Sequence, residues 1–291
     1  MSTDTHSSAL YGLPRPDRTA TVELEDADPK ELVQNVYEIF LDSTNGIRDA
    51  DGIYREACRI TAPFADKLVG LFKEKKPFKK NEQKNLSTGL FLSSICNQSS
   101  KREIVCNNEM KLRCLAAFLP KDKTFINRGK AYHWMGEHAE GTVINYGETG
   151  NEMGYFATGV IINCGETYSW MGSFSESVVA NYGKTANYMG NNSKGLVVNC
   201  GEAGQTMGDG SQGIVIALKT PTTFGNINLA ELLWDKKNRK EIPEVIEYFD
   251  GLKAVLDKGK KDYRALSKLP TGQKITEDVE QMLKKRGLLR Q

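Results

Sequence analysis

The sequence predicts an α+β protein in which a six-coil parallel β-solenoid is flanked by an N-terminal α-helical domain and by C-terminal helices. Met-Gly pairs recur every 18 residues from Met135-Gly136 to Met207-Gly208. A second motif, an apolar triplet followed by Asn, one variable residue and Gly, recurs between them with the same period. Apolar residues at helical spacing lie on both sides of the repeat. A short fixed period that keeps Gly, Asn and β-branched residues in register indicates a solenoid.

The length of the repeat, 18 residues, selects the kind of solenoid. A repeat of two helices needs more than about thirty residues, whereas one β-helix coil is shorter and bonds to the next coil at roughly 4.8 Å. One period before the repeat proper stands Phe125-Ile126-Asn127, and one period after it stands Val215-Ile216-Ala217, which has lost the Asn. We therefore predict six coils between residues 118 and 225.

Identical positions of successive coils should stack into columns. The Asn column is predicted to form a ladder of side-chain amides at a turn, and the Gly column to supply turn conformations that other residues avoid. The Met column is predicted to fill a corner of the narrow core rather than to hold a metal. The ladder residues are Asn127, Asn145, Asn163, Asn181 and Asn199; Met135, Met153, Met171, Met189 and Met207; and Gly129, Gly147, Gly165, Gly183 and Gly201.

The apolar triplets, such as 160–162 and 196–198, predict a sheet that is apolar on both faces. One face lines the core of the rod, so the other must be covered. The cover is expected to be the chain's own helices, a second copy of the chain or another protein. Cys164 and Cys200 lie two coils apart, roughly 9.6 Å at the strand spacing, which is too far for a disulfide.

The flanks of the rod follow in order along the chain. Residues 1–27, rich in Ser, Thr, Asp and Pro, predict an extended or disordered arm. Residues 28–117 predict a helical domain and 226–291 a helical segment that helps to cap the rod. The helices are expected over 29–46, 53–72 with a kink at Pro63, 81–96, 102–118 and 243–256 and from 276 onward, with a short turn over 229–234.

Composition limits the class of protein. Basic and acidic residues nearly balance, at 39 and 37, and no apolar run is long enough to span a membrane. The N-terminus lacks the apolar segment of a secretory leader. Six cysteines without a framework spacing suit a reducing compartment, so a cytoplasmic location is expected.

The phrase that runs from Gly141 to Glu148 recurs along the rod, with Gly159, Gly195 and Gly213 at the start of later strands. Over residues 118–218 this pattern resembles the GXGXG-repeat domain, which occurs at the C-terminus of the glutamate synthase large subunit and in formylmethanofuran dehydrogenase, where it forms one of the subunits. The resemblance implies a right-handed β-helix that holds subunits or domains together. It also implies a rod without catalytic residues of its own.

We expect a structural or protein-interaction function, with the rod as a rigid spine. The sequence has no phosphate loop, dinucleotide fingerprint or zinc motif, so no cofactor and no metal are expected. Aromatic residues between the strands are candidates for a partner surface, and packing of the rod's corner is the alternative use for them. These residues are Tyr155, Phe156, Tyr168, Trp170, Phe174 and Tyr188.

Two other functions stay open. The C-terminal segment carries basic clusters that could contact the phosphates of RNA or of a ribosome. They comprise Lys236, Lys237, Arg239 and Lys240; Lys258, Lys260 and Lys261; and Lys284, Lys285 and Arg286. In the third hypothesis the protein is an enzyme that uses His133, together with the N-terminal domain, as an acid or base. The exposed column of Glu148, Glu166 and Glu202, interrupted by Lys184, is interpreted as a solvated edge that prevents aggregation.

Overall fold

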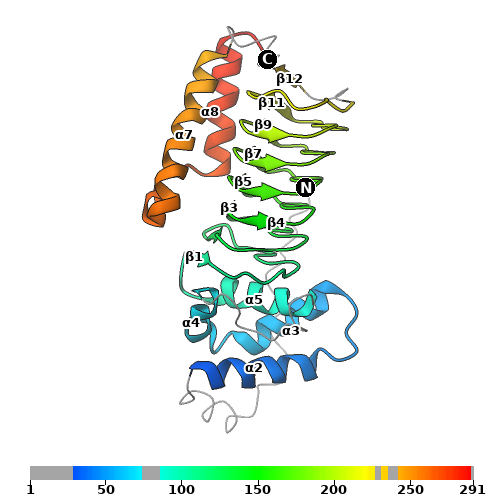
Figure 1. The fold of residues 1–291 in the computed structure, drawn as a ribbon, viewed down its shortest axis with the longest axis vertical. Coiled ribbons are helices and arrows are strands. Elements are labelled where there is room, and N and C mark those ends of the chain that lie inside the picture. The colour runs from blue at the N-terminus through cyan, green and yellow to red at the C-terminus, as the bar shows by residue number, and fades with distance from the viewer. Residues whose placement is uncertain (1–28, 74–85, 227–230, 235–241, 290–291) are drawn as a thin grey trace, which may run out of the picture.

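A computed structural model of the chain describes residues 29–73, 86–226, 231–234 and 242–289. A parallel β-solenoid forms a rod, helices close its N-terminal end, and two long helices lie along one side (Figure 1). This arrangement confirms the predicted fold class. The arm predicted for residues 1–27 lies outside the described residues.

The N-terminal helices form a compact cap. They are α2 (Pro29–Ser43), α3 (Ala50–Thr61), α4 (Ala65–Leu68), the 3-10 helix η1 (Val69–Lys73) and α5 (Leu86–Gln98). The carboxylate of Asp49 caps α3 by accepting a hydrogen bond from the backbone N–H of Gly52. The helix expected over 53–72, with a kink at Pro63, is divided there into α3 and α4, because proline has no N–H to continue the helical bonds.

Helix α5 packs directly on the first coil of the rod. A Cβ atom on Gly89 would lie 1.6 Å from the carbonyl oxygen of Arg113, so only glycine permits this approach. The Ser93 hydroxyl donates to the carbonyl of Cys114 over 2.7 Å. The Phe72 and Phe125 rings meet edge to face at 5.9 Å. Buried residues of the cap and of the rod interior therefore form one continuous core.

Two parallel sheets build the rod. The strands of the larger sheet, in spatial order, are β1 (Glu103–Cys106), β2 (Thr124–Asn127), β3 (Thr142–Asn145), β5 (Val160–Asn163), β7 (Val178–Asn181), β9 (Leu196–Asn199), β11 (Ile214–Ala217) and β12 (Glu231–Trp234). The smaller sheet contains β4 (Glu148–Thr149), β6 (Glu166–Thr167), β8 (Lys184–Thr185) and β10 (Glu202–Ala203). Asn145 pairs with Asn163 and Asn163 with Asn181, so the register follows the 18-residue period.

The rod is longer than the repeat predicts. The helix expected over 102–118 is wrong, because strand β1 lies there and pairs with β2. The short turn expected over 229–234 is also wrong at 231–234, where β12 pairs with β11. Ile104 of β1 pairs with Phe125, 21 positions later, so this coil departs from the period and escapes a search for it. The boundary placed between residues 117 and 118 accordingly falls inside the first coil.

The methionine column fills the interior of the rod. Met135, Met153, Met171 and Met207 are 0% exposed and Met189 is 1% exposed. They join the inward-facing residues of the larger sheet, such as Val143, in one apolar cluster. Flexible thioether side chains fill the irregular space at the corner, where each coil turns back.

The outward face of the larger sheet is covered by the chain's own C-terminal helices (Figure 1). Outward residues, among them Ile144, Ile162 and Val198, share a buried cluster with α7 (Pro243–Lys261) and α8 (Gly272–Lys285). The 3-10 helix η2 (Tyr263–Lys268) connects these helices. Helix α8 begins four residues before the predicted Thr276, because the Thr271 hydroxyl caps it.

The variable residue of the repeat holds this helical pair in place. The Tyr146 hydroxyl donates to the carbonyl of Leu256 over 2.6 Å, and the Tyr182 hydroxyl donates to that of Phe249 over 3.0 Å. Cys164 lies one coil from each of these tyrosines and is a free thiol. Burial raises its pKa to about 12, so the thiol is protonated at neutral pH.

Candidate functional site

The asparagine column forms a continuous hydrogen-bonded ladder. Each side-chain amide donates to the side-chain oxygen of the next coil, at 2.8 Å from Asn127 to Asn145 and at 2.9 Å from Asn145 to Asn163. The ladder ends at Asn199, whose amide donates to the carbonyl of Lys219 because the next coil has Ala217 instead of Asn. All the amide side chains of the column are buried, so this ladder belongs to the frame of the protein and not to a binding surface.

The glycine column has a different cause from the one predicted. The glycines that follow the asparagines, such as Gly165, do not have positive φ angles. A Cβ atom on Gly165 would instead lie 2.1 Å from the carbonyl oxygen of Gly147 in the preceding coil. The backbones of adjacent coils approach too closely here for any side chain. Left-handed backbone occurs in the Met-Gly turn instead, for example at Gly172 with φ of 67°.

The Met-Gly turn is the most unusual part of the rod. Each coil places three alternate residues in the left-handed region, as at Trp170, Gly172 and Phe174 with φ of 62°, 67° and 55°. A bulky side chain at such an angle costs roughly 1–2 kcal/mol. The equivalent outer positions of a later coil hold Thr206 and Gly210, also left-handed. The turn therefore forms without aromatic residues.

Aromatic rings occupy these strained positions in the earlier coils and stack along the rod. His138 stacks on Phe156 at 5.2 Å, and Phe156 contacts Phe174 at 5.5 Å. A second column places Trp170 on Tyr188 at 5.5 Å, nearly parallel. Together with Tyr155 these residues form the aromatic corner, which consists of Tyr155, Phe156, Trp170, Phe174 and Tyr188. Five of the six predicted surface aromatics thus lie at this turn, in two stacked groups.

The aromatic corner is open to solvent. Phe156, Trp170 and Phe174 are 42%, 39% and 43% exposed, which places them among the few large apolar side chains at the surface of the described residues. Tyr155 lies against both phenylalanines, with ring centroids 4.4 and 5.6 Å away. Packing within the corner therefore leaves much of each ring uncovered.

Carboxylates border the aromatic corner. Glu152 occupies the left-handed position between Trp134 and Trp170 in the column. It forms no ion pair among the described residues. Burial raises the pKa of Glu137, and the negative charges of Glu152 and Asp51 raise it further. Glu152 therefore brings to the corner a carboxylate that no ion pair among the described residues neutralises.

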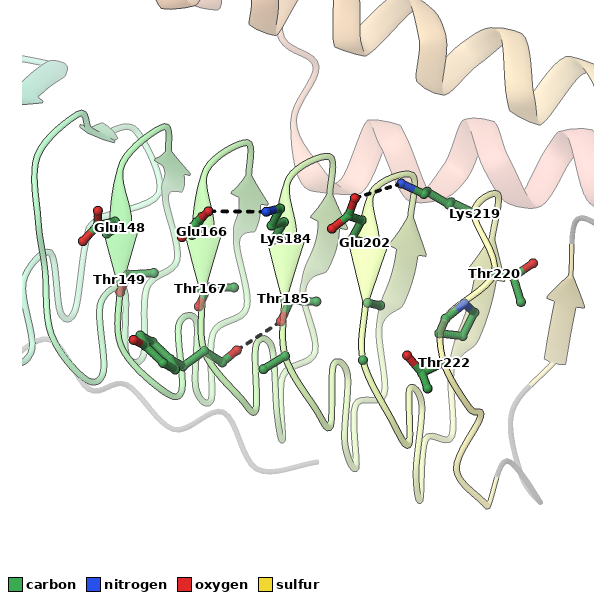
Figure 2. Close-up of a pocket in the computed structure, with 15 residues that line it drawn as sticks. Glu148, Thr149, Glu166, Thr167, Lys184, Thr185, Glu202, Lys219, Thr220 and Thr222 are labelled. Atoms are coloured by element: carbon green, nitrogen blue, oxygen red, sulfur yellow. Dashed lines mark hydrogen bonds and ion pairs between the residues drawn. The ribbon is translucent and has the colours of Figure 1, made fainter.

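A second open surface runs along the smaller sheet. Figure 2 shows this groove, of about 660 Å³, with one charged side chain per coil along its rim. The predicted glutamate edge is a row of ion pairs, namely Glu148 with Lys130, Glu166 with Lys184, and Glu202 with Lys219, at 3.0, 3.7 and 3.5 Å. The charges cancel in pairs, so the groove has no preference for either sign of ligand.

The threonine hydroxyls on the floor of the groove also form hydrogen bonds within the protein. The hydroxyls of Thr149 and Thr185 donate to the carbonyls of Tyr132 and Tyr168 in the preceding coil. Tyr168, the sixth predicted surface aromatic, lies in this groove, 67% exposed and apart from the aromatic corner.

His133 lies on the same side of the rod as the groove, toward its N-terminal end, and has a structural role. Its Nδ1 atom accepts a hydrogen bond of 3.0 Å from the backbone N–H of Asn151. At the equivalent position of the next coil, Asn151 accepts from the N–H of Ser169. Burial and the nearby Arg113 lower the pKa of His133. This histidine is a neutral acceptor in a coil-to-coil bond, and the arrangement does not favour the enzyme hypothesis.

The basic clusters do not form a single patch. Lys258, Lys260 and Lys261 end α7, whereas Lys284, Lys285 and Arg286 end α8. The helices are antiparallel, as the ion pair between Arg286 and Glu244 at the start of α7 shows, so the two clusters lie at opposite ends of the pair. The cluster of Lys236, Lys237, Arg239 and Lys240 lies outside the described residues. No observation on the described residues favours RNA binding.

These features define a β-solenoid protein whose larger sheet is covered by its own helices and whose opposite side is open. No family model, no curated protein and no solved structure matches the chain. The GXGXG resemblance therefore rests on the sequence pattern alone. In the described part of the chain, no helix combines the length and the apolar character that crossing a membrane requires. The described residues also contain no cluster of three or more His, Cys, Asp or Glu suited to a metal ion.

Proposed function

We propose that this protein is a non-catalytic interaction protein in which the solenoid is a rigid spine and the aromatic corner binds another protein. The observation that carries the proposal is the position of the exposed aromatic residues. Phe156, Trp170 and Phe174 have left-handed backbone, where later coils have Asn192, Thr206 and Gly210. At the position of Phe156 and Phe174, later coils thus have Asn and Gly, which tolerate this backbone better, and at the position of Trp170 a later coil completes the turn without an aromatic ring.

Stacking within the corner offsets part of this cost, since an aromatic pair contributes about 0.5–1.5 kcal/mol. Stacking does not require the aromatic residues to be exposed, yet Phe156 and Phe174 are 42% and 43% exposed to solvent. Exposed aromatic side chains held on a rigid frame are typical anchors of protein interfaces. The frame is rigid here because the larger sheet bonds each coil to the next, and the asparagine ladder and the smaller sheet add bonds along the middle of the rod.

The test replaces the aromatics by the residues that the protein itself uses in later coils. The double variant Trp170→Thr and Phe174→Asn should keep the fold, because Thr206 and Asn192 adopt the same backbone. Proteins captured by the tagged wild-type chain from its host, in the presence of nuclease, should be lost from the double variant. Tyr263→Ser, which removes another aromatic that is 43% exposed, is the matched control.

The proposal fails if the double variant, with an unchanged thermal unfolding curve, retains the same captured proteins as the wild type. It also fails if capture disappears with nuclease and depends on Lys258, Lys260 and Lys261, because the working surface would then be basic and bind nucleic acid.

A further inference from the structure

The first coil shows how this side of the rod holds a cation. The guanidinium of Arg113 lies over the Trp134 ring, 5.5 Å from its centroid, and 5.7 Å from the centroid of Tyr132. This is a cation–π contact, in which the negative face of the ring attracts a positive group. Trp134 belongs to the left-handed column that contains Trp170.

Trp170 repeats this arrangement without a cation from its own chain. The residue equivalent to Arg113, one coil before Trp170, is Asn151, which carries no charge. Tyr188 covers one face of the Trp170 ring. On the side of the preceding coil, the column has Glu152 instead of a ring. The carboxylate of Glu152 is thus the counter-charge for a cation bound on the face of the Trp170 ring that Tyr188 does not cover.

The surroundings have the matching charge. Glu152 acts electrostatically on both Glu137 and Tyr155, so the three side chains are neighbours. Glu140, also exposed, belongs to the same coil as Glu137 and forms no ion pair among the described residues. Further along the rod, the carboxylate of Glu176 is paired with Lys194 at 2.9 Å. Of these carboxylates, Glu152 is the one in the coil next to Trp170, and it has no ion pair among the described residues.

We infer that the aromatic corner binds an arginine- or lysine-bearing segment of another protein, with a cationic side chain placed over Trp170 and beside Glu152. This inference rests on the proposed function and specifies the chemistry of the partner. Arginine is the better fit, because a planar guanidinium stacks on an indole while it donates hydrogen bonds to a carboxylate. The charge-neutral groove of the smaller sheet provides no such preference.

The experiment uses the full chain and fluorescein-labelled hexapeptides in which glycine alternates with arginine, lysine or glutamate. Fluorescence anisotropy should show saturable binding of the arginine peptide, weaker binding of the lysine peptide and none of the glutamate peptide. Glu152→Gln and Trp170→Thr should each weaken the arginine peptide by roughly fivefold, the value of an exposed cation–π contact or ion pair. High salt should weaken binding to the wild type.

The matched control is Glu166→Gln, which removes a carboxylate from the smaller sheet at the next coil and should leave peptide affinity unchanged. Equal binding of the arginine and glutamate peptides, or an unchanged affinity in Glu152→Gln, would overturn the inference. Self-association that requires Glu152 and the lysines at the end of α7 would overturn it as well, because a second copy would then be the occupant.

The two proposals can fail separately. If a captured partner is lost on Trp170→Thr but is indifferent to Glu152→Gln and to salt, the interaction function stands and the cationic chemistry is wrong. If no partner depends on the corner at all, the interaction function itself fails.

Discussion

The side-chain amide of Asn163 donates a hydrogen bond of 2.9 Å to the side-chain oxygen of Asn181, one coil further along the rod. The side-chain oxygen of Asn163 in turn accepts a hydrogen bond of 2.9 Å from Asn145, in the preceding coil. Asn163 is therefore a link in the middle of a buried chain of amides, and its loss leaves partners unsatisfied on both sides.

Asn163→Ala should lower the free energy of unfolding by about 3 kcal/mol, since each buried group left without a partner costs roughly 1–3 kcal/mol. Urea unfolding followed by circular dichroism measures this change. Asn127→Ala, at the first position of the ladder, should cost less because it has a ladder partner on one side only. Equal losses at the two positions would show that the ladder is not the source of the stability.

Gly165→Ala should be strongly destabilising, because its methyl group would lie 2.1 Å from the carbonyl oxygen of Gly147. Gly251→Ala is the opposite case. Gly251 lies within α7 with nothing within 4 Å of a Cβ atom, so alanine there should stabilise by about 0.5–1 kcal/mol. Thermal unfolding of the two variants checks both signs. A tolerated Gly165→Ala would contradict the close packing of adjacent coils.

His133 should make stability depend on pH below neutrality. Its pKa in the folded protein is lowered from 6.5, so the unfolded chain binds a proton at a higher pH than the folded protein does. The contribution of neutral His133 to the free energy of unfolding is therefore fully present above pH 6.5. It falls as the pH drops toward the pKa of the folded state and then levels off. Denaturant unfolding between pH 7.5 and 4.5, roughly the range around the histidine pKa, measures the slope.

His133→Asn supplies the control for this pH dependence. Asparagine is the residue that accepts the equivalent bond one coil later, where Asn151 receives the N–H of Ser169 at 3.1 Å. The variant should keep its stability near neutral pH and lose the histidine part of the slope. An identical slope in the variant would assign the pH dependence to titratable groups other than His133.

Tyr182→Phe should weaken the attachment of α7 to the rod. The variant loses the hydrogen bond to the carbonyl of Phe249 and should cost about 1 kcal/mol. Hydrogen exchange should then be faster in α7 and α8 than in the sheets. Tyr168→Phe, at an exposed ring in the groove, is expected to change neither quantity. Uniform acceleration across the rod in Tyr182→Phe would mean that the helices and the solenoid unfold together.

The 18-residue period allowed the solenoid and its columns to be predicted, because stacked coils place equal demands on equal positions. It failed at the first coil, where Ile104 pairs with Phe125 at a spacing of 21. The period also led to the wrong reason for the glycine two residues after each asparagine. Both a close approach between backbones and a left-handed turn require glycine, so the sequence cannot distinguish the two causes. The aromatic residues with left-handed backbone lie four residues apart on either side of the Met-Gly pair, and this spacing is visible in the sequence. Their backbone strain is visible only in the φ angles.

The sequence by itself determined the repeat, the length of the coil, the buried methionine column and the need to cover an outward apolar sheet, because these depend on local pattern alone. Only the tertiary structure decided that α7 and α8 form this cover, that His133 accepts a backbone bond and that the hydroxyls of Tyr146 and Tyr182 bond to α7. Each of these relationships joins residues through the stacking of coils or the docking of distant helices. Their geometry depends on three-dimensional packing, which the spacing of residues along the chain does not encode.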